Sequence, residues 1–308
     1  MDDQGIRRER TQNLWLSFER KFPPIAKATR LDPQPQLPFE RIGGLAVPKE
    51  EIMTYACAAT HREVYARWGT FPPSGLLLIG PGGCGKTLLA QALATRADTA
   101  FLRVDVPRLV IELMHSVGKL GDLLSGWSQS FEEMPPVTVF FDELEFSQAQ
   151  EFGGNRPDLP IGPVMDFLLE LVDRTIADED TLVVGSTAHP DTLRHAFVSA
   201  GRFERVVEVT PSFPDDHVAA LEIHAADAEK RAGRPLFDGI AWADVVRGFR
   251  EASTGEWVRI LHAALRRKAR CEAAGEPVQP VRTTDLLDEV ERARRTHTQL
   301  PAVGGIYL

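Results

Sequence analysis

The sequence has few cysteines, no long apolar run and no excess of basic residues. Its three cysteines, Cys57, Cys84 and Cys271, are too few and too scattered for a disulfide framework or a zinc site. No apolar run approaches the roughly 20 residues of a membrane span, and the charged first residues lack the apolar stretch of a secretory signal. Lys and Arg number 35 against 44 Asp and Glu, and this net charge of −9 argues against a protein that coats duplex DNA. These absences predict a cytoplasmic protein with neither a membrane nor a nucleic acid as its partner.

The pattern of apolar residues predicts an α/β fold. Hydrophobic residues make up 43% of the 308 residues and charged residues 26%, as in a globular protein of one or two domains. From Phe39 onward, short apolar runs alternate with amphipathic helical stretches, which is typical of a parallel sheet sandwiched by helices. The expected strands lie at 76–79, 101–104, 137–141, 182–184 and 206–209. After Pro214 only helical patterns remain, and they predict a small all-α domain with helices at 217–231, 256–270 and 283–295.

We predict four parts along the chain: a helix with a proline-rich arm (1–38), an α/β nucleotide-binding domain (39–212), a helical domain (213–300) and a tail (301–308). The first part combines an expected helix at 11–22 with a proline-rich stretch that is expected to be an extended linker. Leu14, Trp15, Phe18 and Phe22 recur at helical spacing in that helix, so they either pack on the protein's own core or bind a partner.

A glycine-rich loop follows the first expected strand of the α/β domain. Residues 80–87 read G-P-G-G-C-G-K-T and lead into a helical pattern, which is the strand-loop-helix context of a phosphate-binding loop. The glycines allow backbone N–H groups to surround an anion, and the helix N-terminus adds its positive end. Lys86 is expected to neutralise the β and γ phosphates of ATP, and the Thr87 hydroxyl to bind Mg²⁺. The nucleotide-binding residues expected here are Gly80, Pro81, Gly82, Gly83, Cys84, Gly85, Lys86, Thr87 and Leu88.

Two acidic residues, Asp142 and Glu143, follow the apolar strand expected at 137–141. A buried strand that ends in two carboxylates is costly unless the carboxylates meet a cation. We expect Asp142 to bind Mg²⁺ through water, and Glu143 to act as the general base that polarises the attacking water.

With these motifs, the chain resembles the AAA ATPase family, in the branch that includes the proteasome-activating ATPases and the membrane-bound AAA proteases. The resemblance extends from about Phe39 to Arg294 and implies a P-loop NTPase AAA module, in which a small all-α lid domain follows the α/β domain. Besides the phosphate loop, it rests on the stretches F-E-R-I-G-G-L (39–45), P-S-G-L-L-L-I-G (73–80), G-R-F-E-R (201–205), F-P-D-D (213–216), L-E-I-H (221–224) and S-T-G-E (253–256).

The resemblance implies nucleotide contacts outside the phosphate loop. Ile42 and Gly43 match the stretch whose backbone packs beside adenine, and His224 matches a histidine that borders the nucleotide. The implied cofactors are ATP and Mg²⁺.

The resemblance also implies a ring. Arg202 and Arg205 match two arginines that project into the neighbouring subunit, where a guanidinium stabilises charge on the transferring phosphoryl group. The chain is therefore expected to form a homo-oligomer, with a hexamer as the expected size. The alternative is that the two arginines lie on the surface and pair with Glu204 or Glu208.

Two positions depart from the family pattern. Ala188 stands where the family usually has an asparagine that orients water, and the hydroxyl of Thr187 is the expected substitute. The pore loop of threading members carries an aromatic residue that grips an extended chain. Neither alignment of this chain, S-V-G at 116–118 or L-M-H at 113–115, supplies one, which leaves Leu113 and Met114 as weaker candidates for grip.

The chain ends in Ile306-Tyr307-Leu308, which resembles the tail by which proteasomal ATPases dock onto a barrel protease. The alternative is a frayed tail or one packed on the chain itself.

Together these patterns predict an ATP-hydrolysing, ring-forming AAA ATPase that remodels or unfolds a protein partner, with its tail as a candidate docking element for a protease or assembly partner. The alternative is a nucleotide-gated assembly protein with slow or absent hydrolysis.

Overall fold

The computed structural model describes residues 3–70, 75–145, 161–193, 195–199 and 201–299. Within them the chain divides into two compact units. The first comprises Met1–Phe39, Val47–Gly80 and Lys86–Glu208, and the second comprises Glu40–Ala46, Pro81–Gly85 and Val209–Leu308. In this division residues 1–39 group with the sheet, and the C-terminal part of the second unit begins at Val209. Two short segments, 40–46 and 81–85, group with that C-terminal part.

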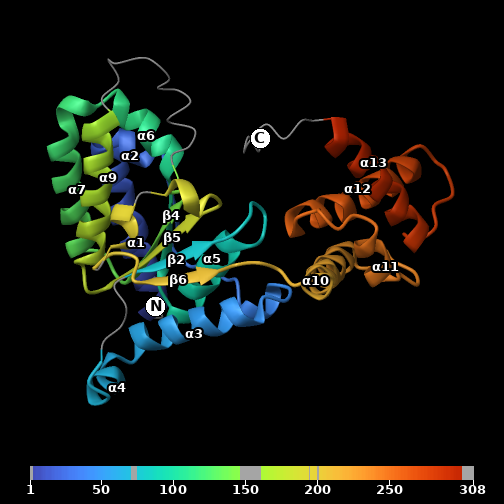
Figure 1. The fold of residues 1–308 in the computed structure, drawn as a ribbon, viewed down its shortest axis with the longest axis horizontal. Coiled ribbons are helices and arrows are strands. Elements are labelled where there is room, and N and C mark those ends of the chain that lie inside the picture. The colour runs from blue at the N-terminus through green and yellow to red at the C-terminus, as the bar shows by residue number, and fades with distance from the viewer. Residues whose placement is uncertain (1–2, 71–74, 146–160, 194, 200, 300–308) are drawn as a thin grey trace. The chain divides into compact units, whose positions relative to one another are not determined.

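The first unit contains a six-stranded sheet of order β1-β3-β4-β5-β2-β6 (Figure 1). Its strands are β1 Thr29–Asp32, β2 Leu76–Ile79, β3 Ala100–Asp105, β4 Val137–Asp142, β5 Thr181–Thr187 and β6 Arg205–Glu208. Neighbouring strands from β3 to β6 are parallel, and β1 runs antiparallel to β3. The five predicted strands are all present, and the predicted α/β class with a mainly parallel sheet is confirmed.

The central strands are buried on both faces. Every residue of β4 and β5 is buried, because helices cover the two faces of a parallel sheet and leave no solvated side. Strand β6 lies at the sheet edge and buries only Val207. The helices of this unit are α1 Asp3–Lys21, α2 Pro23–Ala26, α3 Ala46–Thr60, α4 Arg62–Arg67, α5 Lys86–Ala97, α6 Val106–Met114, α7 Leu120–Glu132 and α9 Ile161–Ile176. Short 3-10 helices lie at Phe39–Arg41, Val117–Lys119, Pro190–Thr192 and His195–Val198.

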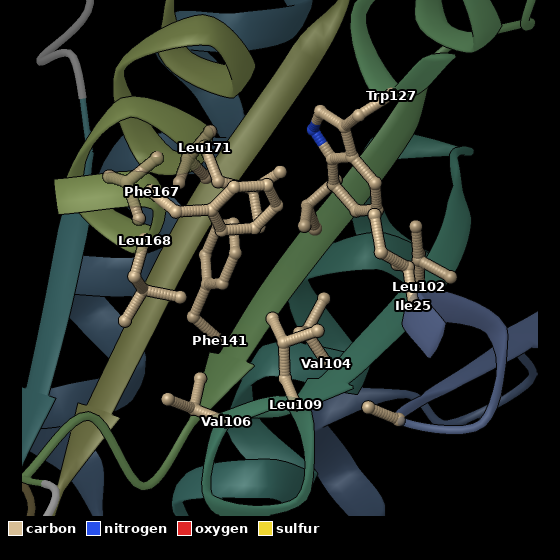
Figure 2. Close-up of a cluster of buried hydrophobic side chains, with 14 of the residues drawn as sticks. Ile25, Leu102, Val104, Val106, Leu109, Trp127, Phe141, Phe167, Leu168 and Leu171 are labelled. Atoms are coloured by element: carbon tan, nitrogen blue, oxygen red, sulfur yellow. The ribbon is translucent and has the colours of Figure 1, made fainter. Parts of the chain in front are cut away.

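The main core of the first unit lies between the sheet and one helical layer. Figure 2 shows Phe141 of β4 beside Phe167 and Leu171 of α9, with Trp127 of α7 farther along the same layer. These four side chains are at most 3% exposed. Helices α3 and α5 cover the other face of the sheet (Figure 1).

The N-terminal helix packs on the protein's own core, which decides between the two alternatives for its aromatic residues. Trp15 and Phe18 are only 2% and 3% exposed, and both meet Trp127 edge-on. Phe22 lies directly over Gly126 of α7, where any side chain would collide with its ring. This close approach of an aromatic ring to a helix backbone requires glycine at position 126.

The proline-rich stretch differs from the extended linker that its composition predicts. It contains α2 and β1, and β1 extends the sheet beyond β3. Ile25 is fully buried, and the carbonyl oxygen of Ala28 accepts a hydrogen bond from the amide of Asp105 at 2.8 Å. The prolines that suggest a linker mostly follow this short strand rather than interrupt it.

The C-terminal part of the second unit is helical, as predicted. Its helices are α10 Asp215–Ala232, α11 Trp242–Arg247, α12 Thr254–Ala273 and α13 Thr283–Gln299. They pack around Trp257 and Leu261 of α12, which are fully buried. The short helix α11 has no counterpart among the predicted elements. None of the helices in the described residues is both long enough and apolar enough to cross a bilayer.

Candidate functional site

The phosphate loop joins β2 to α5 in the predicted strand-loop-helix order. Gly83 and Gly85 have φ angles of +72° and +106°, a backbone conformation that residues with a Cβ rarely adopt. At the start of the loop, the amide of Gly80 donates a hydrogen bond to the carbonyl oxygen of Thr187 at 3.2 Å, which ties the loop to the end of β5. The loop therefore has the backbone that a phosphate cradle needs, and it leaves from the carboxyl edge of the sheet.

Lys86 and Thr87 occupy the first turn of α5. The Nζ atom of Lys86 donates a hydrogen bond to the carbonyl oxygen of Gly80 at 2.6 Å, so the ammonium group reaches the residue that begins the loop. Leu89 is fully buried and anchors the helix, whereas Leu88 is 41% exposed. The two polar side chains that are expected to hold phosphate and Mg²⁺ are thus fixed to the same rigid turn.

Asp142 ends β4 and is only 6% exposed. Its carboxylate has two partners: Oδ1 accepts a hydrogen bond from Oγ of Ser186 at 2.5 Å, and Oδ2 lies 2.7 Å from a guanidinium nitrogen of Arg103. A buried carboxylate needs such partners to remain charged. Sequence patterns did not reveal Arg103 or Ser186, because each comes from a different neighbouring strand.

Glu143 directly follows the strand and has a φ angle of +60°, which is rare for a residue with a Cβ. Its amide donates a hydrogen bond to Oγ of Ser186 at 3.2 Å. Burial raises the pKa of the Glu143 carboxyl, and the negative charges of Asp142 and Glu145 raise it further. A carboxylate with a raised pKa is a better proton acceptor, as a general base requires.

Strand β5 lies between β4, which ends at Asp142, and β2, which leads into the phosphate loop. Thr187 is fully buried, and its Oγ1 accepts a hydrogen bond from the amide of His189 at 3.1 Å. Ala188 contributes its amide, which donates to Oε1 of Glu145 at 2.9 Å. Glu145 is 8% exposed, and its second oxygen, Oε2, is buried without a hydrogen-bond partner among the described residues.

Ile42 and Gly43, which the resemblance implies in nucleotide binding, lie in the second unit. Gly43 contacts the start of α10, where a Cβ atom would come within 2.2 Å of the backbone nitrogen of Ala220. Ile42 is 4% exposed. Within the same unit the amide of Gly255 donates to the carbonyl oxygen of Gly83 at 3.0 Å, so the start of α12 contacts the phosphate loop. The capping box of Ser253 and Glu256 fixes that start.

Arg202 and Arg205 each have an acidic partner in their own chain. The guanidinium of Arg202 makes two bonds to Asp173, at 2.5 and 2.8 Å, and a third to the carbonyl oxygen of Ala196 at 2.6 Å. Arg205 pairs with Glu51 of α3 at 2.5 Å. The side chain of Arg202 is 22% exposed and that of Arg205 is 53% exposed. Each arginine thus pairs with an acid of its own chain, but the acids are Asp173 and Glu51 rather than the Glu204 or Glu208 of the alternative.

The candidate pore segment comprises the last residues of α6 and those that follow it. Leu113 is fully buried in the core of the first unit, so it cannot grip a substrate, and that expectation is wrong. Met114 is partly buried against the same core. The exposed residues of the segment are His115, Gly118 and Lys119, none of which is a hydrophobic residue.

His224 of α10 lies beside His262 of α12, with ring centroids 6.4 Å apart. Burial lowers the pKa of both imidazoles, the nearby His262 lowers that of His224 further, and Arg231 lowers both. Asp227 opposes the shift at His224. These effects favour the neutral form of both rings in the folded protein.

A pH dependence of stability follows from this pair. In the unfolded chain both histidines titrate near their ordinary pKa of about 6.5, so acid protonates the unfolded state first and favours unfolding. The contribution of the two histidines to the free energy of unfolding is complete above that pKa and is lost as the pH falls below it. We expect the melting temperature to fall between pH 7.5 and 5.5, and His262→Gln to make that fall smaller. Scanning calorimetry at both pH values measures it, with His115→Gln, an exposed histidine elsewhere, as the control. An equal fall in wild type and His262→Gln would contradict the expectation.

In the part of the chain that the structure describes, no group of three or more His, Cys, Asp or Glu side chains could hold a metal. Mg²⁺ at a phosphate loop takes few protein ligands and completes its shell with water and phosphate oxygens. Thr87 and Asp142 supply oxygen atoms of the kind that Mg²⁺ prefers. The tail at 306–308 lies outside the described residues.

Comparison with known proteins identifies relatives. Residues 76–211 match the family described as "ATPase family associated with various cellular activities (AAA)". The chain is 33% identical over 204 residues to the proteasome-activating nucleotidase of Methanocaldococcus jannaschii, which covers 65% of this chain and 46% of that protein. It is 28% identical over 297 residues to the proteasome-activating nucleotidase of Archaeoglobus fulgidus, covering 92% of this chain and 68% of that protein.

A third relative is the 26S proteasome regulatory subunit 6A of Schizosaccharomyces pombe, 30% identical over 223 residues, which are 72% of this chain and 49% of that protein. The chain thus spans about half of the length of two of these three relatives.

Proposed function

We propose that the chain is an AAA ATPase, and that it binds and hydrolyses MgATP to remodel a protein partner. The match of residues 76–211 to the AAA family and the similarity to proteasome-activating nucleotidases support this proposal. The observation that carries the proposal is the meeting of three adjacent strands at one sheet edge. Strand β2 leads into the phosphate loop and Lys86, β4 ends at Asp142, and β5 ends at Thr187. Ligands of open α/β sheets bind at this carboxyl edge.

The roles in the proposed reaction follow from chemistry and position. Mg²⁺, when bound, neutralises charge on the phosphates, and Thr87 and Asp142 would hold it. Lys86 neutralises phosphate oxygens from the loop side. Glu143 accepts a proton from the attacking water, and the hydroxyl of Thr187 is the candidate to orient that water. Ile42, Gly43 and His224 are proposed nucleotide contacts.

We place Arg202 and Arg205 in trans, at the nucleotide pocket of a neighbouring subunit. The proposed active form is therefore a homo-oligomer, and we propose a hexameric ring. The proteins named above as proteasome-activating nucleotidases support a protein substrate. A cytoplasmic location, and docking through Ile306-Tyr307-Leu308, belong to the same proposal and rest on resemblance.

Phosphate release from MgATP tests the proposal directly. Because subunits must associate to complete each pocket, we expect the rate per subunit to rise with protein concentration and then level off. Release should stop when EDTA removes Mg²⁺. The assay is a coupled measurement of inorganic phosphate, with the oligomeric state followed by light scattering on the same samples. Tight binding of ATP without phosphate release would instead support the nucleotide-gated assembly protein.

A further inference from the structure

One serine hydroxyl contacts both of the successive acidic residues at the end of β4, Asp142 and Glu143. Ser186 is fully buried near the end of β5. Its Oγ donates a hydrogen bond to Oδ1 of Asp142 at 2.5 Å and accepts one from the amide of Glu143 at 3.2 Å. A hydroxyl can donate one hydrogen bond and accept two. Ser186 thus donates to Asp142 and accepts from Glu143, the next residue in the chain.

The backbone of the same residue makes a third link. The carbonyl oxygen of Ser186 accepts a hydrogen bond from the amide of Leu144 at 2.9 Å, so residues 142, 143 and 144 are all tied to one position of β5. Glu143 needs such support because its φ angle of +60° is disfavoured for a residue with a Cβ. The Glu143 amide bond to Ser186 helps to hold this conformation, and with it the direction of the Glu143 side chain.

The Asp142 carboxylate is fixed at both of its oxygens. Arg103 of β3 holds Oδ2 from one side, and Ser186 of β5 holds Oδ1 from the other. Arg103 carries a charge and is 45% exposed, whereas Ser186 is neutral and buried. Unlike the guanidinium, a neutral donor orients a carboxylate without opposing its charge.

Ala188, two residues farther on, has no polar side-chain atom and engages Glu145 through its amide alone. Position 188 thus offers no side-chain donor to the two acidic residues, and Ser186 supplies that contact instead.

We propose that Ser186 is a positioning residue that sets the carboxylates of Asp142 and Glu143 for Mg²⁺ binding and water activation. This inference rests on the proposed ATPase function. Partners that orient metal ligands from behind change metal affinity or activity by about 10- to 100-fold when they are removed. A serine that merely fills space would change stability and leave Mg²⁺ affinity alone.

The test compares Ser186→Ala with a matched control, Thr138→Val. Thr138 is a fully buried hydroxyl near the other end of β4, and its Oγ1 lies 2.7 Å from Oγ1 of Thr99. Each variant removes one buried hydroxyl: Ser186→Ala from β5, and Thr138→Val from the neighbouring strand β4. Binding of fluorescent N-methylanthraniloyl-ADP is measured with EDTA and across a MgCl₂ titration, together with the rate of ATP hydrolysis and the melting temperature.

We expect Ser186→Ala to bind the nucleotide as wild type does in EDTA. Its half-saturating Mg²⁺ concentration should rise about 10-fold, and hydrolysis at saturating Mg²⁺ should fall about 10- to 100-fold. Thr138→Val should lower the melting temperature and change neither the half-saturating Mg²⁺ concentration nor the rate of hydrolysis. Wild-type Mg²⁺ dependence in Ser186→Ala, or an equal change in Thr138→Val, would overturn the inference.

Two further outcomes are distinguishable. If wild type binds no nucleotide, the proposed function fails and this inference fails with it. If Ser186→Ala does not fold, Ser186→Cys takes its place, because a thiol fills the site but is a weak donor and acceptor. The same shift in Mg²⁺ dependence is then expected, and its absence contradicts the inference.

Discussion

Lys86→Ala is expected to abolish ATP binding, whereas Glu143→Gln is expected to retain ATP and fail to hydrolyse it. The two changes separate phosphate neutralisation from water activation. Lys86 begins α5, and its ammonium group lies 2.6 Å from the carbonyl oxygen of Gly80, which begins the loop. Removal of one member of a hydrogen-bonded charge pair costs about 2–5 kcal/mol, which is roughly a 30- to 5,000-fold loss of affinity.

Glu143→Gln keeps the size of the side chain and removes its ability to accept a proton. General bases contribute about 10²- to 10⁴-fold, so we expect a fall of that size in the hydrolysis rate with ATP still bound. Isothermal titration with ATP and a phosphate-release assay measure the two quantities. Glu9→Gln, on the exposed surface of α1, is a control for the loss of one carboxylate. Turnover by Glu143→Gln at the wild-type rate would show that Glu143 is not the base.

The sequence predicts the sheet and the phosphate loop because local patterns specify them. Buried parallel strands are continuous apolar runs, and the loop needs glycines where φ is positive, as at Gly83 and Gly85. Strand β1 is missed because it has four residues, with burial at most partial, and stands beside a cluster of prolines. Its place in the sheet depends on pairing with β3, which lies some 70 residues away in the chain.

The contacts around Asp142 likewise depend on residues that are distant in the sequence. The strand and the carboxylate are evident from the sequence, but Arg103 and Ser186 meet Asp142 only because β3 and β5 flank β4 in the sheet. Leu113 is a similar case. Its position near the pore segment suggested an exposed apolar side chain, but the inward face of α6 buries it completely. Burial of a single helical residue is decided by packing that local spacing does not fix.

Arg202→Ala is expected to leave ATP binding nearly intact and to lower turnover steeply. An arginine supplied in trans is worth about 10³- to 10⁵-fold in phosphoryl transfer, so a loss of this order is expected if Arg202 serves the adjacent pocket. Within its own chain, Arg202 is held by Asp173 and by the carbonyl oxygen of Ala196. The hydrogen bonds to Asp173 and the negative charge of its carboxylate raise the pKa of the guanidinium.

Mixing two inactive variants distinguishes a trans role from a structural one. A subunit with Lys86→Ala cannot bind ATP but still offers its Arg202 to the next pocket. When it is mixed with Arg202→Ala at equal concentration, roughly a quarter of the head-to-tail interfaces combine an intact pocket with an intact arginine, if subunits assort at random. We therefore expect partial recovery of phosphate release in the mixture, which neither variant shows alone. If Arg202 serves only to hold α9 through Asp173, the mixture remains inactive and Arg202→Ala has a lowered melting temperature. A strictly monomeric protein whose rate per subunit does not depend on concentration would also exclude the trans role.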